Sequence, residues 1–164
     1  MNKAEFKAQV AEYMSKNPDI DYQDGSEWLK ARAREVEVFL TEPNEDSSYP
    51  KVLASFDSLT IRDYALGLAI LNPEVAGAQL NLLFKACPVA LASAPATILA
   101  ILAYSSGNTP LARTYLDKAR QNYPLAILIK RVILAGWPPH NFANLTLELH
   151  PKVSATIFGE LAVA

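Results

Sequence analysis

The sequence predicts an all-α fold, a single compact helical domain over residues 1–164. Apolar side chains recur every three to four residues in most segments, which is the spacing of one face of a helix. Proline, glycine and small polar residues separate these segments at positions typical of helix ends. Hydrophobic residues make up 51% of the chain and charged residues 20%, a balance that suits a buried core rather than a disordered chain.

Charge is distributed unevenly along the chain. Residues 1–63 contain 8 Lys/Arg and 13 Asp/Glu, whereas residues 64–164 contain 7 and 4. We therefore expect an acidic N-terminal helical pair at 1–42, an apolar helical body at 51–142 and a C-terminal segment at 143–164. The formal net charge is −2, so no general positive field attracts nucleic acid or an anionic membrane surface.

Two helices are predicted in the acidic part. The first covers about 3–16 and places Phe6 and Val10 on one face. The second runs from Ser26, a suitable N-cap, to about Leu40. Proline-containing, acidic loops are expected after each of them.

The apolar body begins with three predicted helices. A short one starts at 51–56, and Thr60 is the expected N-cap of the next, at 61–71. The Asn-Pro pair at 72–73 predicts a helix to residue 86, because proline's missing N–H costs nothing in a first helical turn.

Three further helices are predicted at 95–106, 110–122 and 124–135. Each begins with a proline, and glycines end the first and the third, at Gly107 and Gly136. The first of them belongs to a run, 86–112, that contains no Asp, Glu, Lys, Arg or His. Prolines and small polar residues interrupt this run, so it predicts a buried core helix rather than a membrane span.

The C-terminal segment fits two structures. Residues 145–149 alternate like a strand and could pair with 153–158 as a short β-hairpin. The same residues also fit short helices, which we favour because every preceding element is helical.

The junction between the helices at 95–106 and 110–122 has a recognisable spacing. Gly107, Ala112, Ala119 and Pro124 stand at the intervals of a tetratricopeptide repeat, with Leu116 at the large apolar position between the alanines. The stretch 95–124 therefore resembles one helical hairpin of that repeat. The resemblance implies two helices held close together by small side chains.

A wider resemblance covers about residues 59–142. The segments "IRDYAL" (61–66), "APATILAILAYSSGNTPLARTYLDKA" (94–119) and "YPLAILI…LAGWPP" (123–139) are similar to the C-terminal half of an actinobacterial family known as domain of unknown function 4192. The resemblance implies a helical fold and a bacterial or phage-related origin. It implies no activity, cofactor or catalytic residue.

The residues that carry chemistry are few. Cys87 is the only cysteine, which excludes an intrachain disulfide and a cysteine-based zinc site, and it follows a helix end where the dipole disfavours a thiolate. His140 and His150 each stand beside proline with few acids nearby, which is typical of turn residues rather than metal ligands. No phosphate-binding glycine loop or nucleophile elbow is present. We predict no catalytic, cofactor-binding or metal-binding residues, and no cofactor.

The preferred function is a non-enzymatic helical scaffold or protein–protein interaction module. We expect it in the cytoplasm, because the charged N-terminal stretch lacks the apolar core of a secretory signal. A partner groove on the first helix of the hairpin would be lined by Thr97, Ile101, Tyr104 and Ser105. A foreign protein, a second copy in a homodimer, or the chain's own N-terminal helices could cover it.

Two alternatives remain open. A nucleic-acid-associated factor would use a basic patch at 113–131, formed by Arg113, Lys118, Arg120, Lys130 and Arg131. A solvated outer face is the preferred interpretation of these residues, and a nucleic-acid partner is not expected. The second alternative is an enzyme of unrecognised type.

Overall fold

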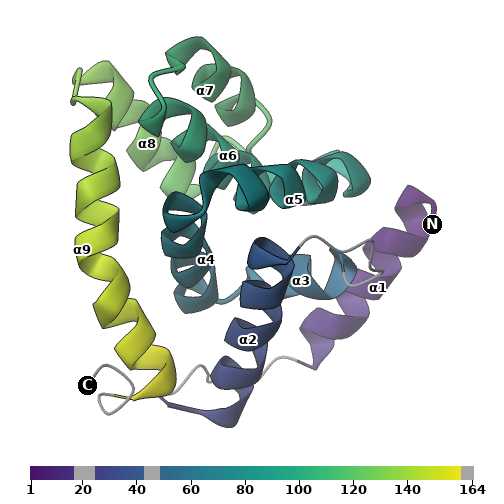
Figure 1. Ribbon diagram of the computed structural model, residues 1–164. Helices are drawn as coiled ribbons and strands as arrows, with labels where there is room; N and C mark the ends of the chain where they lie inside the picture. The colour runs from purple at the N-terminus through teal and green to yellow at the C-terminus, as the bar shows by residue number, and fades with distance from the viewer. Residues whose placement is uncertain (17–24, 43–48, 160–164) are drawn as a thin grey trace.

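The computed structural model describes residues 1–16, 25–42 and 49–159. Over these residues the fold is all-α, as predicted, with nine α-helices, one 3₁₀ turn and no strand (Figure 1). The elements are α1 (Lys3–Ser15), α2 (Glu27–Thr41), α3 (Tyr49–Ser55), α4 (Leu59–Leu71), α5 (Pro73–Ala86), η1 (Val89–Leu91), α6 (Ser93–Ser105), α7 (Thr109–Leu116), α8 (Pro124–Leu134) and α9 (Pro139–Phe158).

The two N-terminal helices begin with side-chain caps. Asn2 accepts a hydrogen bond from the backbone N–H of Glu5, whose carboxylate accepts one from Asn2 in return. In α2, the predicted cap is confirmed, because Ser26 Oγ accepts from the N–H of Leu29 at 3.2 Å. α1 packs on α3, and α2 packs against α3, α4 and α5, so both helices belong to the same core as the body.

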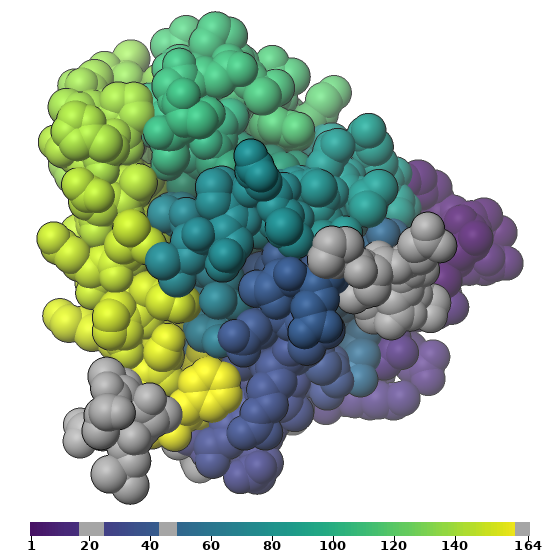
Figure 2. Space-filling model, viewed as in Figure 1, coloured from purple at the N-terminus to yellow at the C-terminus, as the bar shows by residue number. Residues whose placement is uncertain are grey.

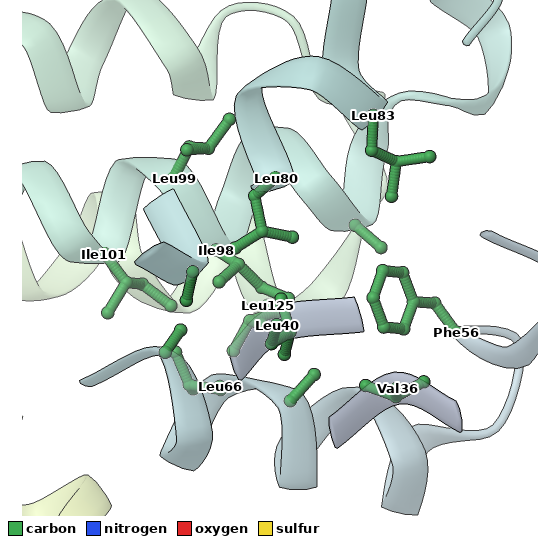
Figure 3. Packing of buried hydrophobic residues seen from close by; sticks show 14 of the residues in the cluster. Val36, Leu40, Phe56, Leu66, Leu80, Leu83, Ile98, Leu99, Ile101 and Leu125 are labelled. Carbon is green, nitrogen blue, oxygen red and sulfur yellow. The ribbon is translucent and has the colours of Figure 1, made fainter. Parts of the chain in front are cut away.

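Side chains from α2, α4, α5 and α6 meet in the centre of the molecule. Figure 3 shows Leu40, Leu66, Leu80 and Ile98 directed toward a common interior. Leu40, Leu80 and Ile98 are fully buried, and Leu66 is nearly so. Burying each such side chain contributes roughly 1.5–3 kcal/mol, so this shared interior is what holds the helices together.

Two helix starts in the body differ from the prediction. Ser58, not Thr60, caps α4, because its Oγ accepts from the N–H of Ile61 at 3.2 Å and the helix begins at Leu59. Asn72 occupies the N-cap position of α5 as predicted, but its side chain makes no capping bond. Its amide donates instead to the carbonyl of Leu68 in the preceding helix.

α6 and α7 form a helical hairpin with its turn at Gly107, which has a φ of 87° that suits glycine. α6 begins at Ser93, so Pro95 lies in its first turn rather than at its start. α7 ends at Leu116 instead of 122. The N–H of Arg120 donates to Ser93 Oγ at 2.9 Å, so the chain turns back to the start of α6 instead of continuing the helix.

The C-terminal segment is one continuous helix over its described residues, so the β-hairpin is excluded there and the favoured helix is confirmed. α9 runs along one flank of the molecule and packs mainly against α4 (Figures 1 and 2). It continues through Pro151, because Ile157 beyond the proline is fully buried and its burial stabilises the helix past that point. The carbonyl of Thr156 accepts from the N–H of Gly25, which ties the end of α9 to the start of α2. Residues 160–164 lie outside the described residues.

Lys3 joins the first helix to the end of α5. Its Nζ donates to the carbonyls of Lys85, Ala86 and Cys87 at 2.7, 2.8 and 2.9 Å. These carbonyls lack helical partners and carry the negative end of the helix dipole, so a single ammonium group satisfies and neutralises them together. No helix in the described parts of the chain combines the length and the apolar character needed to cross a bilayer.

Candidate functional site

The predicted partner groove is part of the core. Thr97 and Ile101 are fully buried and Tyr104 is 4% exposed. Ser105 is half-buried, and its Oγ has no hydrogen-bond partner. These side chains therefore form no open surface in this chain, because α4, α5, α7, α8 and α9 all pack against α6.

The predicted basic residues are all exposed but do not act as one patch. Arg113 and Lys130 line a shared groove between α7 and α8. Arg120 lines a different pocket beside Arg62, and its guanidinium lies 5.9 Å from the Tyr123 ring centroid. Lys118 and Arg131 line neither of these pockets. The fold therefore distributes these exposed cations over more than one site.

The groove between α7 and α8 combines an apolar floor with a charged rim. It encloses about 370 Å³ and is lined by Leu116, Ile133 and Leu134, with Arg113, Asp117 and Lys130 around them. Leu116 is buried, whereas Leu134 is 87% exposed. Single exposed leucines are common on protein surfaces, so the feature that distinguishes this groove is the apolar hollow that Leu116, Ile133 and Leu134 form together. The sequence analysis did not single out Leu134, although the helical period places it on the side of α8 opposite the buried Leu125.

A family model described as Domain of unknown function (DUF4192) matches residues 2–140. The chain belongs to this family. The match starts at residue 2, so it includes α1, α2 and α3, which the resemblance over 59–142 had left outside. Neither the curated proteins nor the solved structures yielded a match.

A second pocket of this DUF4192 chain contains two arginines. It encloses about 300 Å³ where α1, α4, η1 and the α7–α8 connection meet. Arg62 and Arg120 both lie about 6 Å from the centroid of the Tyr123 ring, a cation–π arrangement. Arg62 is nearly buried and forms a 2.8 Å ion pair with its neighbour Asp63. Asp57 also lines this pocket, so its arginines are largely balanced by carboxylates.

Titratable side chains of the DUF4192 chain meet where α4 faces α9: Tyr64 is buried, His150 is half-buried and Glu37 is exposed. His150 stacks on Tyr64, with ring centroids 5.4 Å apart, and Tyr64 donates a long hydrogen bond to Glu37 at 3.4 Å. Burial lowers the pKa of His150, although Glu37 acts in the opposite direction. Burial, with a smaller effect of Glu37, raises the pKa of Tyr64 to about 12. Both rings are therefore uncharged at neutral pH.

Cys87 and the histidines contribute no reactive arrangement to the described part of the chain. Cys87 is buried, and burial raises the pKa of its thiol although Lys3 acts in the opposite direction. His140 is exposed in the first turn of α9, about three turns away from the half-buried His150. No group of three or more His, Cys, Asp or Glu side chains in the described residues could hold a metal ion.

Proposed function

We propose that this DUF4192 chain is a non-enzymatic interaction module that binds an acidic amphipathic helix of a protein partner in the α7–α8 groove. The observation that carries the proposal is the apolar hollow of Leu116, Ile133 and Leu134, with the cations Arg113 and Lys130 on its rim. Apolar anchors of a partner helix would fill this hollow at helical spacing. Its acidic side chains would meet Arg113 and Lys130, which outnumber the single carboxylate of Asp117 on the rim.

The resemblance to one tetratricopeptide hairpin supports the same function. The hairpin of α6 and α7 contains Gly107 at its turn and Ala112 fully buried at the helix contact. Helical repeats of this kind bind partners along helix surfaces. Here the second helix of the hairpin offers the surface, because α6 is buried by its neighbours. The proposal includes a cytoplasmic setting.

Selection from a displayed library of amphipathic helical peptides tests the proposal. Peptides enriched on the wild-type chain should carry Asp or Glu beside their apolar anchors. Their affinity should fall at least about tenfold on Leu134→Asp, and by a similar factor on Arg113→Glu with Lys130→Glu, as expected for truncated anchors and rim charges. Val89→Asp is the matched control, because Val89 is also highly exposed, at 79%, but lies on η1 outside the groove.

Two outcomes would contradict the proposal. Selected peptides that bind Leu134→Asp and Val89→Asp equally well would place their site elsewhere. Salt-sensitive binding of duplex DNA that is lost on Arg113→Glu with Arg120→Glu would favour the nucleic-acid function instead.

A further inference from the structure

A pocket that contains a tryptophan lies at the corner where α8 leads into α9 (Figure 1). It encloses about 460 Å³, a volume within the range of small-molecule sites. One aromatic ring, two amides and a carboxylate stand in its lining, which consists of Trp137, Pro138, Asn141, Asn144, Leu145 and Glu148. None of these residues lines the α7–α8 groove, so the pocket is separate from the surface proposed to bind a partner helix.

The backbone around Trp137 is fixed on both sides. Its N–H donates to the carbonyl of Val132 at 3.3 Å, and its own carbonyl accepts a hydrogen bond from the hydroxyl of the buried Tyr104. Proline at position 138 restricts the backbone that follows. Trp137 itself is 46% exposed, so the fold holds an aromatic side chain at the pocket and leaves about half of its surface open to a ligand.

The polar side chains of the pocket lie on one face of α9. Asn141, Asn144 and Glu148 follow one another at intervals of three and four residues, which is the spacing of a single helix face. All three are exposed, and their side chains make no hydrogen bond or ion pair with the described residues. Each amide can both donate and accept, whereas the carboxylate only accepts. Adjacent hydroxyl groups of a ligand would match this set, because a hydroxyl also donates and accepts.

The charge of the lining favours a neutral ligand. Glu148 is charged, and no lysine or arginine lines the pocket. A phosphate or a carboxylate would therefore be repelled. A wholly apolar ligand would cover the amides and the carboxylate without replacing their bonds to water, which is costly. The ligand that fits is neutral and rich in hydroxyl groups, with one apolar side.

We propose that this pocket binds a neutral pyranose sugar, either free or at the end of a glycan. The C–H groups on one side of a pyranose ring carry a slight positive charge and would stack on the negative face of the Trp137 indole. Adjacent hydroxyl groups would donate to the carboxylate of Glu148 and exchange hydrogen bonds with the amides of Asn141 and Asn144. One ring and a few hydrogen bonds correspond to a dissociation constant on the order of millimolar.

Titration of the isotope-labelled chain with methyl glycosides tests the proposal by NMR. The probes are the methyl glycosides of glucose, galactose, mannose and N-acetylglucosamine. At least one of them should shift the indole N–H signal of Trp137 along a saturable curve. The indole N–H of Trp28 is the internal control, because Trp28 lies in α2 and its signal should not move. Glycerol has hydroxyl groups but no ring to stack, so it should cause no saturable shift.

Variants of the lining show whether the sugar occupies this pocket. Trp137→Ala should weaken binding at least about tenfold and Asn144→Ala about fivefold, with the backbone N–H of Glu148 as the reporter. Asn122→Ala is the matched control for the lost amide, because Asn122 is exposed between α7 and α8 and lines no part of the pocket. Unchanged NMR signals outside α9 would show that each variant keeps its fold.

Three outcomes would overturn the proposal. The first is the absence of a saturable shift with every methyl glycoside at about a hundred times the expected dissociation constant. The second is equal affinity of Asn144→Ala and Asn122→Ala for the sugar. The third is saturable binding of tetramethylammonium without binding of any glycoside, which would assign the pocket to an organic cation held by Trp137 and Glu148.

Trisaccharides distinguish the two sources of the sugar. Tighter binding of maltotriose or cellotriose than of methyl glucoside would identify the end of a glycan, and equal binding would identify a free sugar. Either result supports the pocket as a pyranose site.

Discussion

His150 is held against the backbone of α4 with little room to spare. An ideal Cβ built on Gly67 would overlap the imidazole ring, so the close packing of α9 on α4 depends on the missing side chain of this glycine. Nδ1 of His150 is buried and has no hydrogen-bond partner. Adding a proton there would place a charge next to apolar groups, which explains the direction of its pKa shift.

The depressed pKa of His150 predicts a loss of stability in mild acid. Below the ordinary histidine pKa of about 6.5, the unfolded chain binds a proton that the folded chain binds only at lower pH. The contribution of this residue to the free energy of unfolding is therefore fully present above about pH 6.5 and declines as the pH falls toward the folded-state pKa. Urea denaturation of wild type and His150→Gln at pH 7.5 and 5.5 measures this, and the wild type should lose more stability between the two.

His140→Gln provides the matched control for this measurement, since His140 is exposed near the start of the same helix. The control should show the same pH dependence as the wild type. An identical pH dependence of stability in His150→Gln and wild type would refute the attribution of this loss to the lowered pKa of His150.

Gly67→Ala should destabilise the fold by about 1–3 kcal/mol, because the new methyl group meets the His150 ring. In a His150→Ala background the same substitution should become neutral or stabilising, since alanine favours a helix over glycine by about 1 kcal/mol. Gly77→Ala in α5 is the control and should stabilise, because its Cβ meets only Leu102 at an ordinary 3.8 Å. Chemical denaturation of these variants gives their free energies of unfolding and, by a double-mutant cycle, the coupling energy between Gly67→Ala and His150→Ala. A coupling energy near zero would contradict the contact between residue 67 and the His150 ring.

At the scale of single residues, the sequence indicates which side chains could carry chemistry but does not show which neighbours they contact in the fold. His150 was interpreted as a turn residue because proline follows it, whereas the structure places it inside a helix and against Gly67. Arg120 was assigned to a patch with Arg113, but the two line different pockets. The partners of His150 lie far away in the sequence, and no local pattern reports them. Arg120 lies beyond the end of α7, beside Tyr123, so it does not share the helix face of Arg113.

Helix ends in this fold are completed by groups from other helices as well as by local caps. The three carbonyls at the end of α5 accept from Lys3, more than 80 residues earlier in the chain. Lys3→Met keeps most of the apolar stem and removes the donors, and it should cost about 1 kcal/mol of unfolding free energy. Lys7→Met on the exposed face of α1 controls for the lost charge and should cost much less. Equal losses in the two variants, measured by urea denaturation, would argue against the cap.

Because α4 begins at Leu59, the hydroxyl groups of Ser58 and Thr60 should contribute differently to the free energy of unfolding. Ser58→Ala should cost about 1 kcal/mol, because it removes the acceptor for the N–H of Ile61. Thr60→Ala should change stability by less than about 0.5 kcal/mol, since Thr60 is inside the first turn and caps nothing. Thermal unfolding of the two variants distinguishes them, and a larger effect of Thr60→Ala would restore the original prediction.

Most helices could be predicted from the sequence because their start and stop signals are local. Ser26, Pro73 and Gly107 act through the backbone of their own turn, and the structure confirms each of them. α7 and α9 were predicted less well, because a distant hydrogen bond to Ser93 shortens one and burial of Ile157 extends the other. Tertiary contacts override local propensity in both cases.

The whole molecule shares one core, which joins the acidic N-terminal helices to the body. Leu40 of α2 and Ile98 of α6 belong to the same buried cluster, and α9 contacts both α2 and α4. We therefore expect one cooperative unfolding transition, in keeping with the single domain predicted from the length of the chain. The α7–α8 groove could not be predicted at this scale, because it forms where Leu116 of α7 and Leu134 of α8 come together, and no sequence pattern reports how two helices pack.

The two tryptophans lie in different parts of the fold: Trp28 in α2 packs against the core, and Trp137 lies between α8 and α9. Trp28→Phe and Trp137→Phe each leave one fluorescent probe. Their urea denaturation curves should coincide with each other and with the curve from circular dichroism. Separate midpoints for the two probes would show that the acidic helices unfold independently of the body.

Because α9 covers α4 but is synthesised much later, the nascent chain exposes part of α4 during translation. About seventy residues separate the end of α4 from the start of α9, so the ribosome exposes Tyr64 and Gly67 long before their covering helix is made. Translation proceeds at roughly 5–20 residues per second, which leaves this apolar surface open for several seconds in each nascent chain. A chaperone that binds emerging apolar segments would find its target in this interval, and a pause in translation before α9 would lengthen it.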